Sequence, residues 1–391
     1  MNAVAQPQTI ATSRWRWLVP PTIGASVLAG VLVLVTSYAW LDSAHAAQER
    51  VVYFFVNLIV VLALQTFSGN SGMMSFGHMA FVGVGAYVAG ILTLDPSLKQ
   101  TEVTGLPGFI ENSKTSFLPA MGAAIGVAVV IALVTGLILF RLGQASAIIG
   151  VFSLLLISNT IFGGWTGVTG GGGGIYGMPR DTTVGLSLVV AIVCVFVARY
   201  FRDSSFGMKL RASREERAAA EAVGVRVFAL RLTAWVLSAA MASAAGSLLA
   251  MRTTAIDPTA FYLSPTFLVV AMIVIGGTTT VGGAVAGAVL VTVVREVSLQ
   301  LESHSLHLGP IHFSRLTGLS QILVVLMILV TMYFRREGLG GRLEIDEYIS
   351  RRILDRRREP EAGAEVPDNG GRLSLRNLRL NIPSLRRAQR R

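Results

Sequence analysis

Long apolar stretches separated by short polar segments fill most of the first 334 residues of this 391-residue chain. An α-helix needs about 20 apolar residues to cross about 30 Å of hydrocarbon, and ten runs of suitable composition occur. They lie near residues 18–40, 51–67, 76–94, 118–140, 146–163, 184–201, 228–250, 264–278, 282–300 and 317–334. The third, fifth, eighth and ninth are short or glycine-rich, which makes them candidates for broken or re-entrant helices buried in protein. The pattern predicts an all-α polytopic membrane protein with eight to ten transmembrane helices.

The composition supports this class. Hydrophobic residues make up 52% of the chain and charged residues only 14%, which is too apolar for an ordinary water-soluble globule. The one cysteine, Cys194, lies in the sixth run. It therefore has no partner for a disulfide within the chain, and we interpret it as a small core residue.

Basic residues indicate the orientation of the runs. If ten spans alternate, Arg14, Arg16, Arg141, the basic stretch 199–231 and the arginine-rich C-terminus all fall on one side. That side is predicted to be the cytoplasm, with both termini inside. A cleaved signal peptide is the competing interpretation of the first run, because an Ala-His-Ala sequence follows it. The run is longer than the apolar core of such a peptide, which favours a membrane span.

The polar loop 202–227, between the sixth and seventh runs, carries its own helix signals. Ser213 and Glu216 have the spacing of a capping box, and Gly224 supplies a left-handed stop, so a helix is predicted over 214–223. Helical spacing places small residues on one side and charged residues on the other. This surface suits docking on a cytosolic partner, although a solvated loop helix has the same signals. The candidate docking residues are Arg211, Ser213, Arg214, Glu215, Glu216, Arg217, Ala218, Ala219, Glu221, Ala222 and Gly224.

Polar and glycine motifs also interrupt the apolar runs. Ser75 and His78 stand at the start of the third run, where a histidine is either functional or a cap for a neighbouring helix. The glycines at 170–174 cannot form a lipid-facing helix, so they line water or protein, and glycines at 276–277 and 282–283 bracket a similar break. No phosphate-binding loop, catalytic set or metal-binding motif occurs, so any ATP would be hydrolysed by another subunit.

Taken in order, these motifs resemble the LivM-type permease of branched-chain amino acid ABC importers over about residues 50–342. The matching segments are 75–78 (Ser-Phe-Gly-His), 169–171 with 177–179, 210–224, 232–250, 276–277 and 335–339. The resemblance implies a bacterial inner-membrane subunit without catalytic residues or a cofactor of its own. It also implies a LivH-like second permease, two cytosolic ATP-binding subunits that use ATP and Mg²⁺, and a periplasmic substrate-binding protein. The loop helix would then be the coupling helix of an alternating-access transporter.

Departures from the family pattern leave the substrate open. Gln65, Asn70, Pro265 and Arg336 stand where the family usually has other residues. Branched-chain amino acids are the leading substrates, and urea, short amides and aromatic carboxylates remain alternatives. The candidate residues of the substrate pathway are Gln65, Asn70, Ser75, His78, Thr169, Gly170 and Gly171.

Three segments make up the predicted organisation: a cytoplasmic N-terminus over 1–17, a permease domain over 18–334 and a basic tail over 335–391. The tail carries 15 basic and nine acidic residues, a net charge of +6. Its last part suits an anionic lipid surface better than nucleic acid, because no aromatic residue lies among its arginines. A short amphipathic helix is expected over 343–354.

Two other classes of function are less favoured. A proton-coupled secondary transporter working through His78 would need a buried acidic partner, and Glu296 is the main acid within the runs. A membrane-bound enzyme would need a paired nucleophile and base, which the sequence does not offer.

Overall fold

The computed structural model describes residues 19–41, 45–303, 306–308, 311–313, 318–335, 338–341 and 344. The chain divides into a compact unit, Met1–Tyr348, and a second unit, Ile349–Arg391, which lies outside the described residues. The predicted N-terminal segment 1–17, the amphipathic helix 343–354 apart from Glu344, Arg336 and the basic end of the tail also lie outside them. The sequence placed the end of the permease domain at 334, whereas the compact unit extends to Tyr348.

A helix occupies each of the ten apolar runs. They are α1 (Val19–Leu41), α2 (His45–Leu64) with the π-helix η2 (Gln65–Gly69), α3 (His78–Thr93), α6 (Phe117–Leu139), α7 (Gln144–Gly164), α9 (Val184–Asp203), α12 (Val227–Thr253), α13 (Leu263–Gly276), α14 (Val281–Ser303) and α15 (Leu319–Phe334). Within the described ranges, seven helical spans are long and apolar enough to cross a membrane, and three shorter apolar helices accompany them. The predicted all-α polytopic fold is confirmed.

Shorter elements fill the connections. They are α4 (Pro96–Glu102), α5 (Gly108–Glu111), α8 (Thr166–Thr169), η3 (Gly171–Gly173), α10 (Ser205–Ala212), α11 (Arg217–Ala222) and η4 (Pro258–Phe261). Strand β1 (Ile175–Tyr176) pairs antiparallel with β2 (Ala255–Ile256), and β3 (Leu306–Leu308) pairs with β4 (Ile311–Phe313).

Two of the four runs suspected of breaks are continuous helices. The fifth run forms α7, with 21 residues, and the ninth forms α14, with 23 residues. Glycines in α14 serve close packing instead: a Cβ atom on Gly283 or Gly287 would collide with backbone atoms of α13. The third and eighth runs do form short helices, α3 with 16 and α13 with 14 residues.

Helices α2 and α12 form the centre of the domain. In the most apolar 18-residue stretch of each helix, 89% of the residues are buried in α2 with η2 and 78% in α12. The corresponding share is 22% in both α6 and α7. Alanines 120, 124, 128 and 132 of α6 are all buried, because every fourth residue of a helix returns to the same face. Large side chains such as Leu118, Val130 and Ile138 are exposed on the other faces. This distribution suits a central pair of helices and a lipid-facing outer pair.

Helix α3 packs against α12 with almost no side chain between the backbones. A Cβ atom on Gly85 would collide with the carbonyl oxygen of Ser243, and one on Gly246 would collide with that of Val82. The Ser247 hydroxyl donates a hydrogen bond of 3.2 Å to the Gly85 carbonyl across the same contact. Glycine and serine at these positions therefore allow the close approach of α3 and α12.

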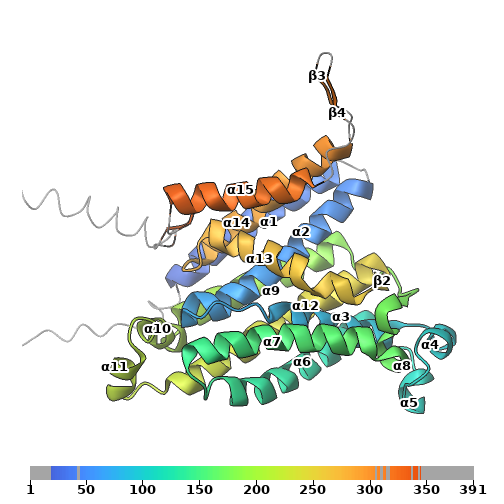
Figure 1. Cartoon of the computed structure of the whole chain (residues 1–391), viewed down its shortest axis with the longest axis horizontal. Coiled ribbons are helices and arrows are strands. Elements are labelled where there is room, and N and C mark those ends of the chain that lie inside the picture. Colours follow the sequence, from blue (N-terminus) through green and yellow to red (C-terminus); the bar gives the residue numbers. More distant parts are fainter. Residues whose placement is uncertain are drawn as a thin grey trace, which may run out of the picture. The chain divides into compact units, whose positions relative to one another are not determined.

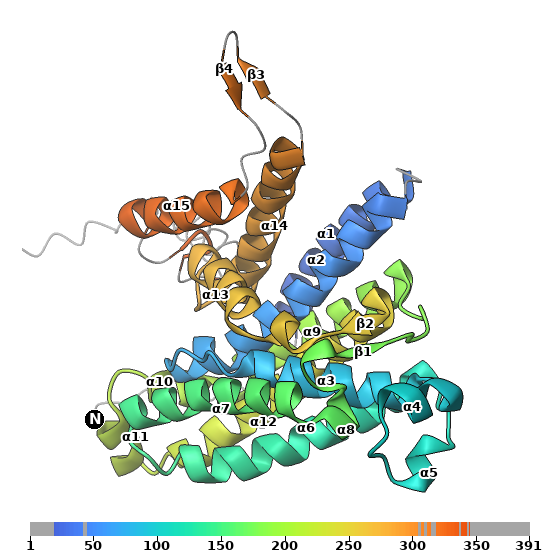
Figure 2. The same cartoon turned by 45° about the vertical axis from the view of Figure 1, so that its right-hand side comes forward.

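The connections gather at two opposite ends of the helices (Figures 1 and 2). Helices α10 and α11 lie at one end, which we call the coupling end, and α4, α5, α8 and the β1–β2 pair lie at the other, the outer end. Successive long helices run between the ends in alternation, as membrane spans must. The structure therefore supports the predicted alternation of loops.

Candidate functional site

The predicted loop helix is shorter than expected and begins later. Helix α11 starts at Arg217, not at residue 214, and ends at Ala222. The predicted capping box is wrong: Ser213 ends the preceding helix α10, where its hydroxyl donates to the Leu210 carbonyl at 2.7 Å. Glu216 is the N-cap of α11, and its carboxylate accepts the Ala218 amide. The left-handed stop at Gly224 is confirmed by a φ of +84°.

Helix α11 presents a shallow exposed surface at the coupling end. Ala218, Ala219 and Ala222 are exposed, whereas Ala220 is buried against the domain. Val223 is 80% exposed at the end of the helix. Arg217 and Glu221 form an exposed ion pair of 2.8 Å beside the alanines. The surface therefore has the predicted character, small residues beside charges, and Glu215 and Glu216 are exposed next to it.

Arginines fasten this loop to the end of α2. Arg211 donates to the side-chain oxygen of Asn70 at 3.1 Å and to the carbonyl of Arg202 at 2.5 Å. Arg214 donates to the Gly69 carbonyl at 2.9 Å. Gly69 closes the π-helix η2, whose wide turns leave backbone carbonyls that a side chain can reach. A displacement of α10 would therefore act directly on the end of α2 through these hydrogen bonds.

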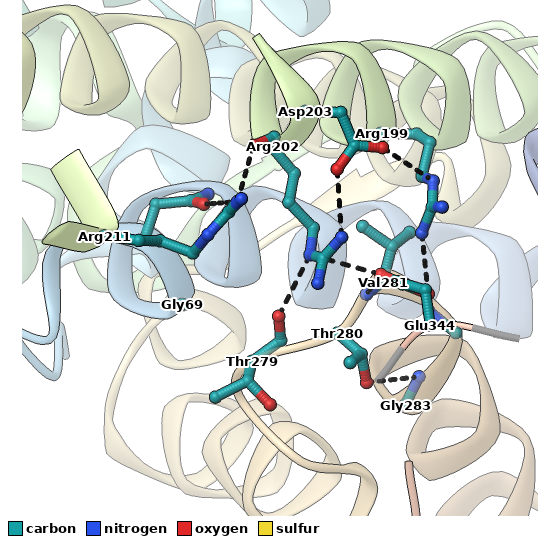
Figure 3. A network of polar contacts seen from close by, with 12 residues as sticks. Gly69, Arg199, Arg202, Asp203, Arg211, Thr279, Thr280, Val281, Gly283 and Glu344 are labelled. Carbon is teal, nitrogen blue, oxygen red and sulfur yellow. Dashed lines mark hydrogen bonds and ion pairs between the residues drawn. The ribbon is translucent and has the colours of Figure 1, made fainter. Parts of the chain in front are cut away.

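A buried ionic cluster joins α9 to α14 at the same end (Figure 3). Glu344 is 2% exposed and lies 2.8 Å from Arg199 and 3.4 Å from Arg202. Its carboxylate also accepts the Val281 amide at 2.6 Å and the Gly282 amide at 3.3 Å, so it caps the N-terminus of α14. A carboxylate is favoured there because helix N-termini carry unpaired amides and a partial positive charge.

Asp203 completes the cluster. Its two carboxylate oxygens lie 3.2 Å from Arg199 and 2.9 Å from Arg202. Each of the two buried guanidinium groups thus lies between two carboxylates, which offsets the cost of removing Arg199, Arg202 and Glu344 from water, while Asp203 stays partly exposed.

The segment that carries Glu344 lies along the turn between α13 and α14. Leu339 and Gly340 donate their amides to the carbonyls of Ile275 and Gly276 at 2.9 and 2.8 Å. Thr279 donates to the Gly341 carbonyl at 2.9 Å. The Thr279 carbonyl in turn accepts from Arg202 at 3.2 Å. We call Gly338–Gly341 with Glu344 the C-terminal strap. The glycine break predicted near 276–283 is this turn, held by the strap and by α9.

Four predicted pathway residues lie near the coupling end, inside the protein. Gln65 is fully buried, and its side-chain amide has no hydrogen-bond partner in the described part of the chain. Asn70 donates to the Thr66 carbonyl at 2.9 Å and accepts from Arg211. Asn70 therefore joins the coupling loop to α2, and this contact accounts for its polar side chain.

His78 bridges two serines. Its Nδ1 lies 2.8 Å from the Ser75 hydroxyl and its Nε2 lies 2.9 Å from the Ser238 hydroxyl. Ser238 gives its proton to the Trp235 carbonyl, so it accepts from His78, and the proton of the ring is assigned to Nε2. Nδ1 then accepts from Ser75. The imidazole is thus neutral in this arrangement and ties the start of α3 to the middle of α12, a contact between helices that caps neither of them.

The remaining predicted pathway residues lie at the outer end, apart from the first four. Thr169 donates to the carbonyls of Phe162 and Trp165 at 2.7 Å. Gly170 and Gly171 have φ values of +69° and +61°, a conformation that glycine adopts without strain. These residues shape a turn between α8 and β1. The structure therefore does not gather the seven candidates into one site.

A cavity of about 870 Å³ lies elsewhere, between α2, α3 and α12 on one side and α13, α14 and α15 on the other. None of the seven predicted pathway residues lines it. Its polar lining includes Tyr53, Asn57, Ser264, Arg295 and Gln321. The sequence signal that would have found it is Arg295, a charge inside the ninth apolar run, where charged residues are costly.

Comparison with known proteins identifies the family. The family model described as "branched-chain amino acid transport system / permease component" matches residues 46–332. The chain belongs to this family. The high-affinity branched-chain amino acid transport permease proteins LivM of Salmonella typhimurium (strain LT2) and Escherichia coli (strain K12) are each 23% identical over 330 residues, 74% of this chain and 73% of theirs. No solved structure matches. The predicted LivM-type permease is confirmed, and the chain is a multi-pass membrane protein of a transport family.

Proposed function

We propose that this permease is a membrane subunit of an ABC importer that carries branched-chain amino acids across a bacterial inner membrane. The observation that carries the proposal is the exposed α11 surface. It lies on a loop that is fastened to the central helix α2, in a chain of a permease family. A short exposed helix with small side chains suits a groove on a cytosolic ATPase.

The partners follow from this role. A second, LivH-like permease would complete the membrane pathway, two ATP-binding subunits would hydrolyse ATP with Mg²⁺, and a periplasmic protein would deliver the solute. Both termini and the coupling end would then face the cytoplasm, as the distribution of basic residues predicts.

The contacts at the coupling end suggest how movement would pass to the membrane helices. Arg211 connects α10 to the end of α2 and to Arg202, and Arg202 contacts the α13–α14 turn through Thr279. ATP-driven movement of the ATPases would displace α10 and α11 together. The displacement would reach α13 and α14, which line the cavity, and shift the equilibrium between inward-open and outward-open states.

Proton coupling through His78 is less consistent with the geometry. His78 contacts two serine hydroxyls, and Glu296 is paired with Arg50 at 3.5 Å. Neither group offers the ionisable pair that a proton relay needs.

Replacement of Ala218 by Trp tests the proposal. The indole adds bulk to the exposed face of α11, so we expect loss of ATPase co-purification and of ATP-dependent L-leucine uptake in reconstituted vesicles, while the permease still inserts. Ala145→Trp is the control, because Ala145 is exposed at the same end on α7. If Ala218→Trp retains both ATPase binding and uptake, the docking surface is misassigned. If wild-type uptake follows a proton gradient and ignores ATP, the ABC mechanism is wrong.

A further inference from the structure

The cavity changes character along its depth. Ser264 of α13 and Gln321 of α15 lie close to the ends of their helices at the outer end. Residues further along the same helices, such as Ala271 and Ile328, are apolar. Val82 of α3 and Val60 of α2 extend this apolar lining inward. The cavity thus has a polar mouth at the outer end and a mainly apolar floor nearer the middle of the helices, where Asn57 is a polar exception.

Arg295 lies about as many residues from the outer end of its helix, α14, as Ala271 and Ile328 lie from the outer ends of theirs. It is eight residues from the end of α14 at Ser303, which corresponds to about 12 Å along a helix at about 1.5 Å per residue. Its side chain is exposed and lines the cavity. No hydrogen bond or ion pair joins it to any described residue. A charge at this depth in an apolar helix is costly, and an intramembrane ionisable group is a candidate for ligand binding.

Other arginines at the outer end differ from Arg295. Arg50 lies 3.5 Å from Glu296, and Arg180 and Arg252 lie 3.4 and 3.7 Å from Glu49. The two acids in the cavity wall accept hydrogen bonds from backbone amides and do not pair with Arg295. Glu302 accepts the Ser320 amide at 2.7 Å, and Asp257 accepts the Thr259 amide at 2.8 Å. The cavity therefore contains a cation whose partner is not supplied by the described chain.

We propose that this cavity is a solute-binding site in which Arg295 binds a carboxylate and the apolar floor receives a hydrocarbon side chain. The volume of about 870 Å³ falls within the range of about 300–1,000 Å³ typical of small-molecule sites. A guanidinium can bind both oxygens of a carboxylate, which fixes the orientation of the solute. A neutral solute such as urea would leave Arg295 unpaired and the floor unfilled. The inference rests on the proposed transport function and specifies where the solute carboxylate is bound.

Protection of a cysteine in the cavity tests the inference without requiring transport or ATP. Ser264→Cys places a thiol on the exposed part of the lining, in a Cys194→Ala background of the full chain reconstituted in phosphatidylcholine vesicles. We expect millimolar L-leucine to slow reaction with a thiol reagent, and L-leucinamide and urea to leave the rate unchanged. Benzoate should also slow it if a carboxylate and an apolar group are sufficient. A cysteine at Asn112, which is exposed and does not line the cavity, should react at the same rate throughout.

Variants of Arg295 complete the test. Loss of a charge-assisted hydrogen bond weakens binding about tenfold or more, so Arg295→Gln should abolish the protection at the same leucine concentration. Arg295→Lys should retain part of it, and Arg50→Gln should retain all of it. The inference is overturned if leucine and leucinamide protect equally, if neither protects, or if protection persists in Arg295→Gln. Protection by added phosphatidylglycerol but not by leucine would assign the cavity to an anionic lipid, which also overturns it. The ATPase co-purification experiment fails or succeeds independently of these outcomes.

Discussion

Two buried arginines at the coupling end and Arg295 in the cavity are held in opposite ways. At the coupling end, Arg199 and Arg202 are buried between the carboxylates of Asp203 and Glu344. Nearer the outer end, Arg295 is exposed to a cavity and has no partner among the described residues. The first arrangement stabilises a fixed contact between helices, because each buried charge is paired. The second leaves a charge available to something that enters. The partners of an arginine, more than its presence, therefore distinguish a structural site from a binding site.

The largest effect on stability is expected from Glu344→Ala, which leaves two buried guanidinium groups with one carboxylate between them. Breaking a buried ion pair in this way costs about 3–5 kcal/mol. Thermal unfolding of the detergent-solubilised chain should show a large fall in Tm. Glu296→Ala is the matched control, because the exposed Arg50–Glu296 pair is worth only about 0–1 kcal/mol. Equal effects of the two variants would contradict the role assigned to the cluster.

A smaller effect is expected from Arg211→Ala, which removes the bonds to Asn70 and to the Arg202 carbonyl. A hydrogen bond to a charged group contributes about 1.5–3 kcal/mol, so α10 should loosen without unfolding the domain. We expect the ATPases to bind α11 as before and leucine uptake per ATP hydrolysed to fall. Arg226→Ala is the control, since Arg226 is exposed on the same loop. Normal coupling in Arg211→Ala would remove this contact from the proposed transmission.

Asn70 offers a sharper version of the same experiment. Asn70→Asp can still accept from Arg211, whereas Asn70→Leu cannot. We therefore expect Asn70→Leu to lower uptake of every substrate and Asn70→Asp to preserve more of it. The measurement is uptake competition among leucine, urea and benzoate. A changed ranking of these substrates would instead support the direct pathway role that the sequence suggested for Asn70.

The smallest loss of stability is expected at Arg295. Because the side chain has no described partner, Arg295→Gln should lower the free energy of unfolding by no more than about 0.5 kcal/mol. Arg199→Gln provides the contrasting variant and should be strongly destabilising. If Arg295→Gln lowered Tm as much as Arg199→Gln, Arg295 would have a structural partner and the contrast between the two ends would fail.

The sequence predicted the helices well because membrane spans are set by local properties. The length of the apolar runs located all ten helices, and the close approach at Gly85 followed from the absence of a side chain. The start of α11 was mispredicted because Ser213 satisfies two local rules. Its hydroxyl can cap a following helix or bond back to the preceding turn, and here it bonds to Leu210. A local sequence pattern does not decide whether the Ser213 hydroxyl bonds to the preceding helix or to the following one.

The functional residues were harder to predict because they depend on distant contacts. Arg202 and Glu344 are 142 residues apart in the chain, and no periodic pattern connects them. The sequence offered a functional role or a helix cap for His78, and it could not reveal the contact with Ser238 in the middle of α12. The cavity is formed by six helices, so its lining could not be deduced from any single run.

The C-terminal strap has a practical consequence for protein engineering. Glu344 lies ten residues beyond Phe334, the end of the last helix, yet it caps α14. Truncation or fusion at the end of α15 would therefore remove part of the domain that holds the α13–α14 turn. Affinity tags and fluorescent reporters belong after Tyr348, where the compact unit ends. A shortened chain that fails to express should be lengthened to include this residue before its detergent or host is changed.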